Sequence, residues 1–325
     1  MSVRRVRGAL ALLALTTLPL AHAFDLQGHR GARGLAPENT LPAFAAALSL
    51  GVTTLELDTG VTKDGVVVVS HEPMPFPGTV RAPGGAWLTE PGPMISTLTF
   101  AELQRYDVGR LNPAHAYGKP FARQVPVDGT RIPRLAEVFA LAEKAGNRTV
   151  RFNIETKINP AAPQATLPAA EFARAVIGTI RAAGMAGRAS LQSFDWRTLK
   201  VAQAEAPDIA TVYLTAQQPW FDSFAAGGAW TAGLRLEDYG SVPKMVHAAG
   251  GRTWSPYFRD VDAAGLAEAR ALGIAVVVWT VNAPADIARL LDLGVDGIIS
   301  DRPDLVRDEM QKRAMPLPAP TPVSP

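Results

Sequence analysis

The chain has 325 residues, with 32 Lys and Arg against 30 Asp and Glu, and it contains no cysteine. The lack of cysteine excludes disulfide bonds and thiolate metal sites. Its Lys and Arg residues do not form clusters with interleaved aromatic residues, which argues against a nucleic-acid-binding surface. After residue 23, no apolar segment approaches the ~20 residues that a membrane span needs.

The first 23 residues have the pattern of a cleaved signal peptide. Arg4, Arg5 and Arg7 precede an apolar run over residues 9–20, and residues 21–23 (Ala-His-Ala) have the small side chains that a signal peptidase accepts. This segment holds three Arg and no acidic residue, so the mature chain carries 29 basic and 30 acidic residues. We therefore expect an exported protein, periplasmic or secreted.

Short apolar, β-branched runs alternate with helical patterns along the remaining chain, which predicts βαβ units and a parallel sheet. The predicted strands are 24–28, 53–57, 66–70, 149–154, 189–192, 210–214, 274–279 and 297–300. The predicted helices are 40–51, 135–145, 170–183, 196–204 and 284–293. Residues 24–314 suit one α/β domain of the size of a (β/α)₈ barrel, or TIM barrel, which takes ~250 residues.

Two segments depart from this alternation. Residues 73–133 are rich in Pro and Gly, carry Trp87 and Tyr117 among other aromatics, and are too long for an ordinary βα loop. We expect an insertion that forms a small subdomain over the barrel mouth. Residues 315–325 contain five prolines and no periodicity, which predicts a disordered tail.

Three carboxylates follow or end predicted strands. Glu56 and Asp58 lie two residues apart, so they face the same way on a strand, and Glu155 ends another strand. The carboxyl ends of barrel strands meet at one mouth. Three converging carboxylates favour a hard divalent cation, Ca²⁺ or Mg²⁺. The alternatives are a solvated polar strand end and a simple salt bridge between Glu155 and Lys157.

His29 follows the first predicted strand, and His71 follows the strand 66–70. Imidazole exchanges a proton near neutral pH, so two histidines at one mouth suit general acid–base catalysis. We expect His115 and His247 to be structural. Arg30 and Lys157 adjoin the predicted site in the sequence, and two cations beside a metal suit a bound phosphate; alternatively they pair with the carboxylates as scaffold.

Nine short motifs occur in order along nearly the whole chain after residue 23. They are His29-Arg-Gly-Ala, Pro37-Glu-Asn-Thr, Glu56-Leu-Asp, Thr62-Lys-Asp-Gly, Val69-Ser-His-Glu-Pro, Asn153-Ile-Glu-Thr-Lys, Gln192-Ser-Phe, Val278-Trp-Thr-Val-Asn and Asp296-Gly-Ile-Ile-Ser-Asp-Arg-Pro. Together they resemble the glycerophosphodiester phosphodiesterase family.

The resemblance implies a TIM barrel that hydrolyses glycerophosphodiesters to glycerol 3-phosphate and an alcohol with a divalent metal. It further implies an acid–base pair of His29 and His71, and a metal held by Glu56, Asp58 and Glu155. Arg30 and Lys157 would contact phosphate, Trp279 would line the glycerol side of the pocket, and Glu38 would support the site without acting in catalysis.

The sequence departs from the family pattern at Glu72, where aspartate is usual, and at Thr59-Gly60. We expect neither departure to touch the proposed ligands, and we expect the insertion to govern the choice of head group.

Three other functions fit parts of the pattern. A barrel glycosidase would use Glu56 and Glu155 as its carboxylate pair but would leave both histidines without a role. A lysophospholipase D acting on lysolipids fits better, because the aromatics of the insertion could admit an acyl chain. A non-catalytic binding barrel would be marked by loss of a histidine or carboxylate, and all five are present.

Overall fold

The fold is that of a computed structural model, which describes residues 24–225 and 227–325. The predicted signal peptide, residues 1–23, lies outside the described residues. In the described part of the chain, no helix combines the length and apolar character that crossing a membrane requires.

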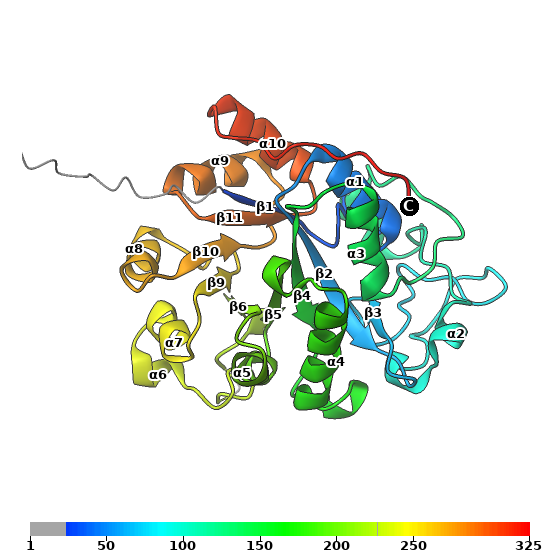
Figure 1. Cartoon of the computed structure of the whole chain (residues 1–325), viewed down its shortest axis with the longest axis horizontal. Coiled ribbons are helices and arrows are strands. Elements are labelled where there is room, and N and C mark those ends of the chain that lie inside the picture. The colour runs from blue at the N-terminus through cyan, green and yellow to red at the C-terminus, as the bar shows by residue number, and fades with distance from the viewer. Residues whose placement is uncertain (1–23, 226) are drawn as a thin grey trace, which may run out of the picture.

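Eight parallel strands of the described chain close into a barrel. They are β1 (Asp25–Gly28), β2 (Thr54–Val61), β4 (Arg151–Thr156), β5 (Ala189–Ser193), β6 (Ala210–Thr215), β9 (Thr253–Pro256), β10 (Ala275–Val278) and β11 (Gly297–Ser300). Neighbours in the order β1, β2, β4, β5, β6, β9, β10, β11 pair in parallel, and β11 pairs with β1 to close the ring. Figure 1 shows the strands at the centre and the helices around them. The prediction of a TIM barrel is confirmed.

The helices around the barrel occupy most of the segments between its strands. They are α1 (Leu41–Leu50), α3 (Leu135–Lys144), α4 (Ala169–Ala182), α5 (Trp196–Glu205), α6 (Leu236–Tyr239), α7 (Val242–Ala248), α8 (Ala263–Ala271), α9 (Pro284–Leu293) and α10 (Pro303–Lys312). Short 3₁₀ helices lie at Ile95–Thr97, Ala116–Phe121, Pro163–Ala165 and Ala186–Arg188. The predicted ranges omit α6, α7, α8, α10 and β9. α6, α7 and β9 are short and α8 is rich in alanine, whereas α10 has an amphipathic pattern, with Val306 and Met310 buried, that could have predicted it.

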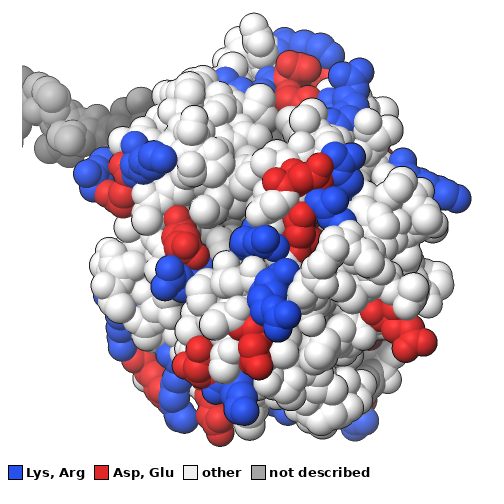
Figure 2. Space-filling model, turned by 90° about the vertical axis from the view of Figure 1, so that its right-hand side faces the viewer, with Lys and Arg blue, Asp and Glu red and all other residues white. Residues whose placement is uncertain are grey.

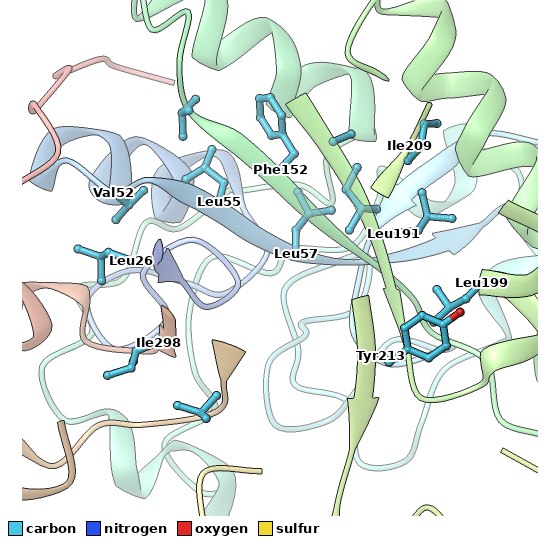
Figure 3. Close-up of a cluster of buried hydrophobic side chains, with 14 of the residues drawn as sticks. Leu26, Val52, Leu55, Leu57, Phe152, Leu191, Leu199, Ile209, Tyr213 and Ile298 are labelled. Atoms are coloured by element: carbon cyan, nitrogen blue, oxygen red, sulfur yellow. The ribbon is translucent and has the colours of Figure 1, made fainter. Parts of the chain in front are cut away.

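The two-residue period of a strand separates core from site along β2. Leu55 and Leu57 are fully buried in the large apolar cluster between strands and helices, as Figure 3 shows. Glu56 and Asp58 alternate with them and therefore face the barrel interior. The same strand thus supplies core leucines on one face and acidic site residues on the other.

His71 reaches the mouth by a hairpin, in which the predicted strand 66–70 follows the preceding strand after a turn at Lys63-Asp64-Gly65, as the sequence indicates. β3 (Val67–Val69) pairs antiparallel with the end of β2. The hairpin brings the chain back along β2, so that Ser70 N donates to Asp58 O at 3.0 Å. His71, the next residue, is thereby returned to the neighbourhood of Asp58.

Ile95, Leu103 and Ile132 of the insertion form a small apolar cluster with Val68 of β3. The one described α-helix of the insertion is α2 (Phe100–Leu103). Figure 2 shows the side of the molecule where the insertion lies in Figure 1, and on this face basic and acidic groups are interspersed between broad areas of other residues.

The segment after α10 is packed against the barrel's outer helices, which corrects the predicted disorder of residues 315–325. Thr321 N donates to Leu48 O at 2.8 Å, and Met315 and Val323 pack against the main core. In Figure 1 this segment runs past α1 to the C-terminus. Apolar residues interleave with its prolines, and the last carbonyls of α1 accept donors from outside the helix.

Candidate active site

Three buried carboxylates converge at the barrel mouth. Glu56, Asp58 and Glu155 each offer an oxygen within 4.8 Å of the others. Burial and the charge of Asp58 raise the pKa of Glu56 well above its usual range, and burial raises the pKa of Glu155 to about 7. Burial would also raise the pKa of Asp58, but the charges of Arg30, His71 and Lys157 together outweigh burial and lower that pKa. This mutual repulsion among hard oxygen donors fits a divalent cation.

A layer of amides beneath the carboxylates fixes their orientation. Gln192 Nε2 donates to Glu56 Oε1 at 2.5 Å, and Asn153 Nδ2 donates to Gln192 Oε1 at 2.8 Å. From the other side, Asn39 Nδ2 donates to Asp58 Oδ2 at 2.8 Å. Because these partners come from several strands and loops, the acidic cluster is held by the barrel as a whole.

Arg30 and Lys157 lie on the carboxylates from two directions. Lys157 Nζ is 3.0 Å from Glu155 Oε1, so the salt bridge considered from the sequence is present. Arg30 Nη1 donates to Glu38 Oε1 at 2.6 Å. Arg30 Nε lies 3.1 Å from Asp58 Oδ2 but is buried without a well-aligned hydrogen-bond partner among residues 24–225 and 227–325. An unsatisfied buried guanidinium N–H is a ready donor for an anion such as phosphate.

His29 is oriented by Asp301. Its Nδ1 lies 2.6 Å from Asp301 Oδ1, and its Nε2 lies 3.9 Å from Glu56 Oε2. Burial, reinforced by the charge of Arg33, lowers the pKa of His29 to about 4. An ionised carboxylate can only accept a hydrogen bond, so Nδ1 carries the ring hydrogen and Nε2 presents a lone pair to the site.

His71 has a carboxylate partner of its own. Its Nδ1 lies 2.7 Å from Oε1 of Glu72, and burial followed by the charge of Arg30 lowers the pKa of His71. Glu72 and Thr59, which depart from the family pattern, both contact residues of the site, and the Thr59 contact with the proposed ligand Glu155 is contrary to the expectation from the sequence. Glu72 contacts His71, and Thr59 Oγ1 donates to the backbone oxygen of Glu155 at 2.7 Å.

Trp279 belongs to an aromatic cluster on the β10 side of the mouth. Its ring meets Phe194 edge-on at 5.3 Å and also packs against Trp220 and Tyr257. Phe194 in turn lies 5.9 Å from Lys157 Nζ. The cluster therefore adjoins the charged site through Phe194, on the wall that the sequence assigns to glycerol.

The sequence missed several residues of this site. Asp301 directly follows the strand β11 within the motif Ser-Asp-Arg-Pro, so its position after a strand end could have revealed it. Arg33 donates from Nε to Asp301 Oδ1 at 2.8 Å, and Tyr117 comes from the insertion to contact Arg30. Their position in the sequence gave no indication of either contact. His115 and His247 lie away from the acidic cluster; His115 Nδ1 accepts from Tyr117 N within the insertion.

The model of the glycerophosphoryl diester phosphodiesterase family matches residues 29–305. The chain belongs to this family. A candidate glycerophosphoryl diester phosphodiesterase from Silicibacter pomeroyi, of known structure, is 36% identical with a TM-score of 0.81, over 91% of this chain and 96% of its own. The glycerophosphodiester phosphodiesterase of Caldanaerobacter subterraneus is 28% identical over 87% of this chain and 96% of its own length. A human lysophospholipase D is 38% identical over 40% of this chain and 35% of its own length.

Membership of the family confirms the resemblance drawn from the nine motifs and the enzyme class that it implied. The matched region begins at His29 and extends past Asp301, so it contains all eight site residues predicted from the sequence.

Proposed function

We propose that this protein hydrolyses glycerophosphodiesters to glycerol 3-phosphate and an alcohol, using Ca²⁺ or Mg²⁺ held by Glu56, Asp58 and Glu155. One observation carries the proposal: three converging buried carboxylates lie within reach of two carboxylate-paired histidines and two cations at the mouth of a barrel of this family. A divalent cation, when bound, supplies positive charge to phosphoryl oxygens.

The protein's own cations bind and orient the phosphodiester. Arg30 and Lys157 are both fixed by carboxylates, so they meet the phosphate with little reorganisation. Their N–H groups would donate to the phosphoryl oxygens. As the phosphorus gains an attacking oxygen, these donors stabilise the growing negative charge.

The two histidines transfer the protons. One removes the proton of the attacking hydroxyl, from water or from the glycerol 2-hydroxyl, as the new P–O bond forms. The other donates a proton to the alcohol oxygen as its P–O bond to phosphorus breaks. In His29 and His71 alike, Nδ1 lies on a carboxylate and leaves Nε2 for the substrate. Attack by the 2-hydroxyl would give a cyclic phosphate that water then opens.

Product identification tests the proposal. The protein, supplied with Mg²⁺ or Ca²⁺, is incubated with glycerophosphocholine and the phosphorus-containing product is identified by ³¹P NMR. We expect glycerol 3-phosphate and free choline. Release of choline phosphate, or no turnover across a panel of glycerophosphodiesters with either metal, would contradict the proposal.

A second candidate activity is that of a lysophospholipase D on lysolipids. The similarity to the human lysophospholipase D supports it, as does the exposed Trp220, 61% accessible beside the Trp279 cluster. Exposed aromatic surface can receive an acyl chain. Comparing kcat/KM for lysophosphatidylcholine and glycerophosphocholine decides between the two substrates.

We also propose export to the periplasm or the exterior, with cleavage after residue 23. The basic start, apolar run and small residues at 21 and 23 support it. N-terminal sequencing of the protein produced from the full-length chain tests this: a start at Phe24 is expected, and retention of the first 23 residues would refute it.

A further inference from the structure

Tyr117 brings the insertion into the candidate site. It lies in the 3₁₀ helix Ala116–Phe121, and its ring meets Phe76 edge-on at 5.3 Å and Phe121 at 5.7 Å. His115 Nδ1 accepts from Tyr117 N at 3.1 Å. Aromatic packing on two sides and a backbone hydrogen bond therefore fix the direction of the phenol.

The hydroxyl of Tyr117 is shared by three charged groups. It donates to Glu38 Oε2 at 2.5 Å. It accepts from Arg30 Nη1 at 3.2 Å and from Arg33 Nη1 at 3.1 Å. Burial and the charge of Glu38 raise the pKa of Tyr117 far above its usual range, so the hydroxyl keeps its proton and the donated bond.

These hydrogen bonds connect the insertion to the phosphate-binding residue Arg30 and, through Arg33, to the histidine His29. Arg30 lies against the acidic cluster, with its Nε 3.1 Å from Asp58 Oδ2. Arg33 continues to Asp301, which holds His29. Two guanidinium groups side by side repel each other, and the phenol oxygen between them, with Glu38, fixes both in one arrangement.

We propose that Tyr117 is a positioning residue for phosphodiester hydrolysis: it sets the Arg30 guanidinium for the phosphate and, through Arg33 and Asp301, supports His29. The inference rests on the proposed function, and it gives the insertion a part in assembling the site. It predicts that removing one oxygen atom in the insertion weakens phosphate binding and slows turnover.

The test is Tyr117→Phe, which keeps the ring against Phe76 and Phe121 and removes the oxygen. Tyr106→Phe is the matched control, because Tyr106 also belongs to the insertion but packs on its apolar cluster. Steady-state kinetics with glycerophosphocholine, calorimetric titration with inorganic phosphate and thermal unfolding are measured on both variants with the activating metal present.

For Tyr117→Phe we expect KM and the dissociation constant of inorganic phosphate to rise about tenfold, the scale of one lost hydrogen bond to a charged group. We expect kcat to fall as well. For the control Tyr106→Phe we expect KM, kcat and the phosphate dissociation constant to stay within about twofold of wild type. Wild-type KM, kcat and phosphate affinity in Tyr117→Phe would overturn the inference, and so would a lowered melting temperature with unchanged kinetics. If wild-type protein hydrolyses no glycerophosphodiester, the proposed function fails, whereas the phosphate titration still tests Tyr117.

Discussion

Replacing Asp301 with Asn tests how His29 is prepared for proton transfer. The Asp301 carboxylate is buried and accepts from His29 Nδ1 at 2.6 Å, from Arg33 Nε at 2.8 Å and from Asn282 Nδ2 at 2.7 Å. An amide at this position can donate to Nδ1, which would place the ring hydrogen on Nε2 and remove the lone pair that faces the site.

The expected loss follows from these contacts. A histidine held in the wrong tautomer loses its acid–base function, so kcat should fall roughly 10²–10⁴-fold. KM should change less than about threefold, because Arg30 and Lys157 do not contact Asp301 and loss of a transition-state interaction leaves ground-state binding intact. The unfolding free energy should fall by about 3 kcal/mol, since Arg33 loses a buried ionic partner.

The assay is release of glycerol 3-phosphate, with ¹⁵N NMR of the His29 ring to report the tautomer. Asp304→Asn is the control, because Asp304 likewise accepts two bonds from an arginine, Arg302, but is partly exposed on α10. It should keep kcat within about twofold. A folded Asp301→Asn protein with more than half of the wild-type kcat would refute the reasoning.

Three further predictions concern the histidines and the C-terminal segment. His29→Ala or His71→Ala should lower kcat roughly 10²–10⁴-fold, whereas His115→Ala and His247→Ala should leave kcat nearly unchanged. With a p-nitrophenyl phosphodiester, whose leaving group needs no proton, only the variant that lacks the general acid should regain much of its rate. Wild-type rates in both His29→Ala and His71→Ala would refute the acid–base pair. Burial lowers the pKa of His29 from 6.5 to about 4, so in metal-free protein the ¹⁵N signals of His29 should stay those of a neutral ring until near pH 4. The contribution of the neutral ring to folding stability is present above pH 6.5 and is lost as pH falls towards 4. Titration of His29 near pH 6.5 would contradict this effect of burial. Removing residues 315–325 should lower the unfolding free energy by about 1–3 kcal/mol, through lost apolar contacts of Met315 and Val323; an unchanged denaturation midpoint would show that the segment adds no stability.

The convergence of the three carboxylates could be predicted because it follows from local sequence patterns. Glu56 and Asp58 alternate with the buried Leu55 and Leu57 along one strand, so strand periodicity alone gives their common direction. Glu155 lies directly across from Asp58 in the parallel ladder. The position of these acidic residues at the ends of apolar strands was therefore enough to predict that the three carboxylates converge.

The rest of the site depends on contacts that sequence spacing does not encode. Tyr117 is 79 residues from Glu38, and Asp301 is 272 residues from His29. His71 comes to the mouth through the antiparallel hairpin of β2 and β3, outside the ring of parallel barrel strands. Local patterns predict which residues face the mouth, whereas the partners that orient them are fixed by loops packed in three dimensions.

The central claim is that a cation held by the three carboxylates is needed for glycerophosphodiester hydrolysis. It is tested most directly by measuring glycerol 3-phosphate release from glycerophosphocholine by protein dialysed exhaustively against a chelator, before and after adding back Mg²⁺ or Ca²⁺. We predict no release by the dialysed protein and recovery with added metal, with recovery abolished in Glu155→Gln. Full activity after dialysis, with no response to either metal, would contradict the claim.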